Sequence, residues 1–212
     1  MSVFNAATVL LGLLTAYLLG SIPTGFVMGK ALRGIDIREH GSGNTGATNV
    51  FRVIGKGAGI TALLIDLVKG VCAVFLMRLL VGSFLDAAAF EKVIAWLLVS
   101  AALLALLGHS KSVWIGFKGG KSAATGLGVL LALIWPVGLS VAAVFGTALA
   151  MSRTVSVGSI AAALSAAVFM VVLHQPLPYI LLAGAGGLYV VLRHRSNISR
   201  LLTGTEPKTF GS

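Results

Sequence analysis

Long apolar runs, each close to the length that crosses a lipid bilayer, constrain this chain more than any other feature. A hydrocarbon core about 30 Å thick requires about 20 predominantly apolar residues per helix. Five segments approach that length, namely 3–28, 58–81, 93–108, 157–174 and 177–193. Of the 212 residues 57% are hydrophobic and 10% are charged, against about 25% charged in an average soluble domain. The composition excludes a soluble enzyme and a disordered chain, and it predicts one all-α integral membrane domain over 1–212.

A sixth apolar stretch, 122–152, is longer than one span and is interrupted at Trp135-Pro136. Because proline cannot continue a helical hydrogen-bond ladder, we expect two short helices of about 14–16 residues that meet there near a membrane surface. With the five long segments they predict seven transmembrane helices. A shallow re-entrant pair would leave five spans, and both odd counts put the two termini on opposite sides of the membrane.

The distribution of basic residues predicts the orientation. Thirteen of the 16 Lys and Arg lie in one alternate set of connecting segments, within 29–57, 109–122, 153 and 193–208. Cytoplasmic loops carry such an excess, so we expect the N-terminus outside and the C-terminus in the cytoplasm. The net charge of +10 is spread over short segments without interleaved aromatic residues. It therefore indicates membrane lipid headgroups or a phosphorylated substrate as partners, and not nucleic acid.

The first predicted cytoplasmic loop combines glycine with short polar side chains in GSGNTGATN, residues 41–49. Glycine permits close backbone approach, and the hydroxyl and amide groups can surround a small polar ligand. Arg52 and Lys56 follow four residues apart, where one helical face could present both charges to an anion. The alternative for this segment is an ordinary flexible turn.

The second loop places KGGKS, residues 118–122, directly before an apolar helix. Exposed N–H groups at a helix N-terminus, together with two ammonium groups, make a phosphate site. The spacing of a Walker A motif is absent. The alternative is that these lysines only anchor the membrane topology.

Isolated charged and polar residues are the remaining candidates for a functional or structural role. Asp66 and Lys69 lie within the second apolar run at i,i+3 spacing, which favours a structural ion pair over a functional site. In the tail, His194 and Asn197 are three residues apart and would share one face if the last helix continues. Glu206 is the single acid of that tail, and a structural ion pair is again favoured. No spacing indicates a metal site.

Four blocks in this order resemble the signature of the bacterial acyl-phosphate:glycerol-3-phosphate acyltransferases. They are GSIPTGFVMGK (20–30), GSGNTGATNVFRVIGKGAG (41–59) with DLVKG (66–70), GH followed by FKGGKSAATG (within 108–126) and HRSNISRLLTGTEPK (194–208). The resemblance implies a seven-helix enzyme of the bacterial inner membrane whose active site faces the cytoplasm. It implies transfer of a fatty acyl group from acyl phosphate to the 1-hydroxyl of sn-glycerol 3-phosphate, giving lysophosphatidic acid and phosphate. This first acylation of phospholipid biosynthesis proceeds in that family without acyl-CoA, cofactor or metal.

The resemblance also implies roles for individual residues. Catalytic roles fall to Ser42, Asn44, His194 and Asn197, substrate binding to Thr48, Arg52, Gly119, Gly120, Lys121 and either Ser156 or Ser159, and a structural role to Glu206. The sequence departs from the family pattern beside the phosphate loop, with Ser122 in place of glycine and Lys111-Ser112 in place of an aromatic-proline pair. The general base stays open. The competing classes are a transporter for a phosphorylated solute, in which a repeat would be expected, and a membrane scaffold.

The predicted orientation can be tested with single cysteines. Gly57→Cys and Ser196→Cys, each in a Cys72→Ala background, should react with an impermeant thiol reagent only from the cytoplasmic side, because the basic loops partition there. Reaction of either cysteine from outside intact cells would contradict the orientation.

Overall fold

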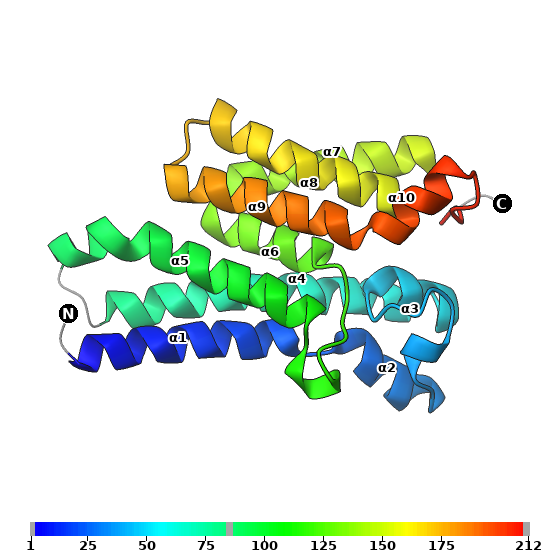
Figure 1. The fold of residues 1–212 in the computed structure, drawn as a ribbon, viewed down its shortest axis with the longest axis horizontal. Coiled ribbons are helices and arrows are strands. Elements are labelled where there is room, and N and C mark those ends of the chain that lie inside the picture. The colour runs from blue at the N-terminus through cyan, green and yellow to red at the C-terminus, as the bar shows by residue number, and fades with distance from the viewer. Residues whose placement is uncertain (1–2, 84–86, 210–212) are drawn as a thin grey trace. The chain divides into compact units, whose positions relative to one another are not determined.

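The computed structural model describes residues 3–83 and 87–209, and within these ranges every regular element is a helix. The chain divides into two compact units, Met1–Leu133 and Ile134–Ser212, each of which is described by itself. In the first unit α1 (Val3–Ser21), α4 (Lys56–Gly82) and α5 (Ala87–Ser110) lie side by side, and α6 (Ala123–Leu133) packs on α4 (Figure 1). The short α2 (Thr24–Arg33) and α3 (Ala47–Val53) contact α4.

Two glycine-based helix crossings hold the first unit together. A Cβ on Gly20 of α1 would overlap the carbonyl oxygen of Ala105 in α5, and a Cβ on Gly108 of α5 would overlap the carbonyl oxygen of Tyr17 in α1. The α4–α6 pair repeats this reciprocal arrangement with Gly70 and Gly128, which face the carbonyl oxygens of Thr125 and Leu67 respectively. Small residues allow such close backbone approach between membrane helices.

A break at Ile22-Pro23 divides the first apolar segment, which we expected as one helix over 3–28. Proline has no N–H to donate and its ring clashes with the carbonyl four residues earlier, so α1 ends at Ser21 and α2 begins at Thr24. Gly34 then ends α2 in a left-handed conformation with φ 67°, where its N–H lies against the carbonyl oxygens of Gly29 and Lys30. The break brings polar backbone groups into the helix bundle.

The second unit consists of α7 (Trp135–Ser152), α8 (Val155–Val172), α9 (Leu177–Arg193) and α10 (Arg195–Leu202). In this unit α8 packs against both α7 and α9 (Figure 1). The stretch 122–152 does form two helices, but α6 has 11 residues and α7 has 18, so the expected length of about 14–16 residues for each is wrong. The reason is that Pro136 occupies the first turn of α7, which moves the break to Ile134.

The surface of both units is strongly apolar. Five described helical segments are long and apolar enough to cross a membrane, or six if the pair α9 and α10, bent by 59°, is one span. Leu64, Phe75 and Val168 are each more than half exposed, whereas Asp66 and Lys69 are buried. Apolar groups outside and paired charges inside are typical of a protein surrounded by lipid.

The α4–α6 crossing generates a stability prediction. Gly70→Ala should destabilise the protein by about 1–3 kcal/mol, the usual cost of forcing an extra carbon into a packed interior, because its Cβ would overlap the Thr125 carbonyl. The matched control is Gly57→Ala, in the first turn of the same helix with no atom within 4 Å of the added carbon. Thermal unfolding in detergent measures both. An equal midpoint for the two variants would contradict the close crossing.

Candidate functional site

The buried amide of Asn49 organises the first polar loop. Asn49 is the third residue of α3 and is 1% exposed. Its Nδ2 lies 3.2, 3.0 and 2.9 Å from the carbonyl oxygens of Ile37, His40 and Asn44, and its Oδ1 accepts the Ser42 N–H at 2.8 Å. One side chain thus satisfies backbone groups along the whole loop, so the loop has a defined shape and is not an ordinary flexible turn.

The predicted site residues of this loop fall on its outer side. Ser42 lies between Gly41 and Gly43, which have φ of 61° and 67°, a conformation that favours glycine. The Ser42 side chain is exposed, and its hydroxyl has no hydrogen-bond partner among residues 3–83 and 87–209. The Asn44 Oδ1 accepts the Gly46 N–H at 2.8 Å.

Thr48 and Arg52 follow the loop on α3, which begins at Ala47. They are four residues apart, so they lie on one face of this helix. Both side chains are half-buried. The structure therefore brings these two predicted binding residues into one short segment with Ser42 and Asn44.

Arg38 pairs with Asp36 in the first loop and connects that loop to the second by a hydrogen bond. The Arg38 guanidinium bonds Asp36 through Nη2 at 2.6 Å and donates from Nη1 to the Ile115 carbonyl oxygen at 3.1 Å. Its Cζ also lies 5.0 Å from the centre of the Phe26 ring. The hydrogen bonds from Arg38 hold the pKa of Asp36 at about 2, so the carboxylate stays charged at neutral pH. The two loops are fixed relative to each other within the first unit.

The second loop is anchored to the end of α1. The Tyr17 hydroxyl donates to the Lys111 carbonyl oxygen at 2.8 Å, and the Ser112 hydroxyl donates to the Ser21 carbonyl oxygen at 2.5 Å. The chain then makes the 3₁₀ turn Val113–Ile115 and passes through Gly116 and Phe117, both with positive φ. Lys111 and Ser112, the departure from the family pattern, are thus part of this anchoring.

The glycine-lysine segment ends directly before α6, as the sequence predicts. The Gly120 N–H donates to the His109 carbonyl oxygen at 3.0 Å, and the Ser122 hydroxyl donates to the Leu106 carbonyl oxygen at 2.7 Å. Ser122 has φ 64°, which positions the chain to start the helix at Ala123. Lys121 is half-buried beside this helix start. A helix N-terminus with an adjacent ammonium group can bind an anion.

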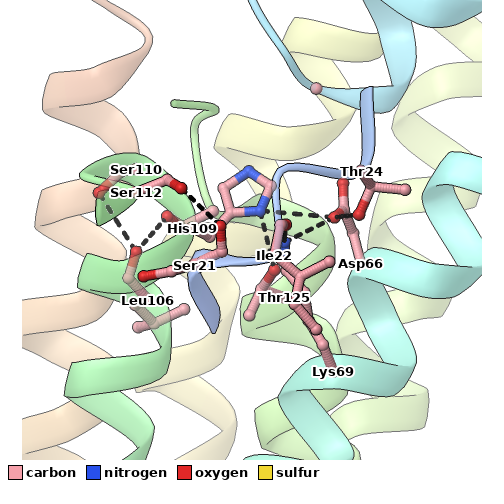
Figure 2. A network of polar contacts seen from close by, with 12 residues as sticks. Ser21, Ile22, Thr24, Asp66, Lys69, Leu106, His109, Ser110, Ser112 and Thr125 are labelled. Atoms are coloured by element: carbon pink, nitrogen blue, oxygen red, sulfur yellow. Dashed lines mark hydrogen bonds and ion pairs between the residues drawn. The ribbon is translucent and has the colours of Figure 1, made fainter. Parts of the chain in front are cut away.

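Asp66 and Lys69 form a buried ion pair, with Nζ 2.8 Å from Oδ1. Figure 2 shows that the pair faces the break between α1 and α2. Lys69 Nζ donates to the Ile22 carbonyl oxygen at 2.8 Å, and the Thr24 hydroxyl donates to Asp66 Oδ1 at 2.8 Å. Sequence reasoning missed a third member, His109, whose Nδ1 lies 3.6 Å from Asp66 Oδ1. Its signal in the sequence was the Gly-His pair at 108–109, which opens the third block of the resemblance.

In the second unit, three donors converge on Glu206, whose side chain is 3% exposed. Oε1 accepts from the Ser156 hydroxyl at 2.8 Å and from the Asn197 amide at 2.6 Å, while Oε2 accepts from Arg200 Nε at 2.7 Å. Burial alone would raise the Glu206 pKa, but the hydrogen bonds from Asn197, Ser156 and Arg200 outweigh it and lower the pKa. The tail is thereby fixed to α8 and α10.

The other predicted residues of this unit lie near the same helices. His194 is 4% exposed at the junction of α9 and α10, and its Nδ1 lies 2.8 Å from the Val190 carbonyl oxygen. Since a carbonyl only accepts, Nδ1 carries the proton and Nε2 is the basic nitrogen in the neutral ring. Ser159 is buried on α8, three residues after Ser156. Within the described part of the chain, no three His, Cys, Asp or Glu side chains are grouped so as to hold a metal ion.

Comparison with known proteins agrees with this architecture. The family model described as glycerol-3-phosphate acyltransferase matches residues 10–204. A glycerol-3-phosphate acyltransferase of Trichormus variabilis is 54% identical over 91% of this chain and 88% of its own. The glycerol-3-phosphate acyltransferase of Thermosynechococcus vestitus is 50% identical over 96% of this chain and 97% of its own.

Two solved structures are also similar, both of PlsY (YgiH), described as an integral membrane glycerol 3-phosphate acyltransferase. Its glycerol 3-phosphate form has a TM-score of 0.84 and 39% sequence identity, and the match covers 96% of both chains. Its lysophosphatidic acid form has a TM-score of 0.81 and 38% sequence identity, and the match covers 96% of this chain and 95% of that chain. The chain therefore belongs to the glycerol-3-phosphate acyltransferase family. It is an all-helical, multi-pass integral membrane protein.

The lowered pKa of Glu206 predicts how stability depends on pH. A carboxyl with a depressed folded-state pKa stabilises the fold above its unfolded pKa and loses that contribution as pH falls through the folded value. Glu206→Gln should therefore cost about 1–3 kcal/mol at pH 7, and the difference from wild type should shrink below about pH 4.3, the ordinary glutamate pKa. Thermal unfolding at several pH values measures this.

The control is Glu39→Gln, which removes an exposed carboxylate of the first unit. Its midpoint should follow that of the wild type throughout the titration. A difference for Glu206→Gln that does not change with pH would contradict a charged Glu206 in the folded protein.

Proposed function

We propose that this chain transfers a fatty acyl group from acyl phosphate to the 1-hydroxyl of sn-glycerol 3-phosphate, releasing lysophosphatidic acid and phosphate. The observation that carries the proposal is the pair of shaped polar loops in the first unit, joined by the Arg38–Ile115 hydrogen bond. They belong to a chain whose similar solved structures include glycerol 3-phosphate and lysophosphatidic acid forms. The reaction would be the first acylation of phospholipid synthesis and would require neither acyl-CoA nor a metal.

The proposal includes the topology expected from the sequence. It has seven spans in the bacterial inner membrane, the N-terminus outside, the C-terminus in the cytoplasm and one acyltransferase domain whose active site faces the cytoplasm. The partition of Lys and Arg between the two sets of loops supports this. In this arrangement a water-soluble glycerol 3-phosphate reaches the polar loops while the acyl chain remains in lipid.

Acyl phosphate is an activated mixed anhydride, so the enzyme mainly has to align the reacting groups and stabilise developing charge. Gly119, Gly120 and Lys121 precede the N-terminus of α6, which supports a role in binding phosphate. Thr48 and Arg52 share a face of α3 and can contact an anion from there. In the second unit, the proposal gives Asn197 a catalytic role and either Ser156 or Ser159 a role in substrate binding.

In the proposed step, the hydroxyl oxygen of glycerol 3-phosphate attacks the acyl carbon and the bond from that carbon to the phosphate oxygen breaks. The hydroxyl proton passes to a phosphate oxygen of a bound substrate. Ser42 and Asn44 orient the reacting groups. This role is supported by the exposed hydroxyl of Ser42, which lies between two glycines in the left-handed backbone conformation. His194 Nε2 is the alternative proton acceptor.

Purified protein incubated with acyl phosphate and glycerol 3-phosphate should release phosphate and form lysophosphatidic acid. Omission of either substrate is the control for hydrolysis. Proteoliposomes that accumulate labelled glycerol 3-phosphate, without forming an acylated product, would instead establish the transporter alternative.

The direct-transfer mechanism predicts that Ser42 is not acylated. A serine nucleophile requires an adjacent base that a third group orients. The histidine nearest to Ser42 in sequence is His40, and its Nδ1 lies 3.0 Å from the backbone carbonyl oxygen of Asp36, not from a carboxylate. Ser42→Ala should lower kcat on the order of 100-fold through misalignment. Rapid quench with labelled acyl phosphate alone, followed by mass spectrometry of the loop peptide, should find no acyl-serine. An acyl group on Ser42 that passes into product would overturn direct transfer.

The role of His194 can be decided from pH–rate profiles. If a substrate phosphate accepts the proton, His194→Gln should lower the rate without removing any titrating limb of the kcat/KM profile. The glutamine can keep the hydrogen bond to the Val190 carbonyl. Disappearance of a limb in the variant would identify His194 as the general base.

A further inference from the structure

The imidazole of His109 lies directly against the glycine-lysine segment of the second loop, residues 118–122. His109 is 8% exposed, near the end of α5. Its carbonyl oxygen accepts the Gly120 N–H at 3.0 Å. A Cβ built on Gly120 would overlap the Nε2 atom of the His109 ring, and one built on Gly119 would overlap the His109 carbonyl oxygen. The loop backbone at Gly119 and Gly120 therefore packs directly on His109.

Space, and not backbone conformation, requires the two glycines. Gly119 and Gly120 do not have positive φ, unlike Gly41, Gly43 and Gly116. A left-handed φ is therefore not what requires glycine at these two positions. What excludes a side chain at Gly120 is the ring of His109, so the position of this ring and that of the loop depend on each other.

The buried polar network fixes the direction of the ring (Figure 2). His109 Nδ1 lies 3.2 Å from the hydroxyl oxygen of Thr125 in α6 and 3.6 Å from Asp66 Oδ1 in α4. Asp66 is itself fixed by Lys69 and by the hydroxyl of Thr24. Since Nδ1 points toward α4 and α6, the opposite edge of the ring, with Nε2, faces Gly120.

We propose that His109 is a positioning residue for phosphate binding, and that Asp66 and Thr125 act through it. The ring sets where the backbone of Gly119 and Gly120 lies, and this determines how well the loop receives the phosphate of glycerol 3-phosphate. The inference rests on the proposed function, and it gives the Asp66–Lys69 pair a role beyond bracing the α1–α2 break. His109 itself need not contact the substrate.

Thr125→Val tests the ring orientation, because valine keeps the shape of threonine and removes the hydroxyl opposite Nδ1. The KM for glycerol 3-phosphate should rise about tenfold, the scale of one lost hydrogen bond in a buried network, while the KM for acyl phosphate stays unchanged. Thr125→Ser should restore the wild-type KM. The matched control is Thr61→Val, whose hydroxyl donates only to the Gly57 carbonyl of its own helix, and which should keep both KM values.

A double-mutant cycle tests the contact between the ring and the loop. Gly120→Ala should raise the KM for glycerol 3-phosphate at least tenfold, since a misplaced binding group costs this much or more. His109→Ala removes the atoms that the new Cβ would meet. The double variant should therefore have a KM no higher than the worse single variant, whereas the effects of distant, independent residues would add.

The outcomes separate this inference from the proposed function. Wild-type protein that forms no lysophosphatidic acid would refute the function. Active wild type with equal rises in both KM values for Thr125→Val, or with additive losses in the cycle, would refute the positioning role. Binding of glycerol 3-phosphate measured by calorimetry on variants with a wild-type thermal midpoint provides a readout that does not depend on turnover. Unchanged affinity for Gly120→Ala in that measurement would also overturn the proposal.

Discussion

The buried Asp66–Lys69 ion pair is the interaction on which the polar architecture of the first unit depends. A charge in the centre of a membrane helix costs about 2.5–3.5 kcal/mol on insertion scales, so each partner needs the other and further hydrogen bonds. Here the additional partners are the Ile22 carbonyl and the Thr24 hydroxyl. The pair thus adds side-chain contacts at the proline break in the first apolar segment, where the Ile22 carbonyl oxygen also accepts the Thr24 N–H at 3.0 Å.

The sequence predicted the elements of this fold better than their ends. Apolar length identified the long helices, and Trp135-Pro136 correctly indicated that 122–152 is divided. The break at Pro23 was not predicted, because the apolar pattern continues through it to residue 28. Its stability depends on Asp66 and Lys69, which are remote in sequence, and local propensity carries no information about such a partner.

In the candidate site, too, the sequence predicted some features and left others to the structure. Glycine spacing indicated both loops, and Glu206 pairs with Arg200, which lies on α10 and not in a loop. The contacts of Asn49 and His109 could not be derived from the sequence, since each depends on where the side chain points in the folded chain. Gly120 illustrates the difference. The sequence indicates a glycine for close approach of a phosphate, whereas the structure shows that a neighbouring imidazole already occupies the space of its side chain.

The Asn49 amide also imposes an order of assembly on the first loop. Its partners, the Ile37, His40 and Asn44 carbonyl groups and the Ser42 N–H, all precede it in the chain. During synthesis, which proceeds from the N-terminus, this segment emerges before the residue that shapes it. The loop can become ordered only once α3 has formed, and α3 packs on α4. The polar loop of this membrane protein therefore takes its shape from a residue at its own C-terminal end, which lies on a short helix that packs on the next long one.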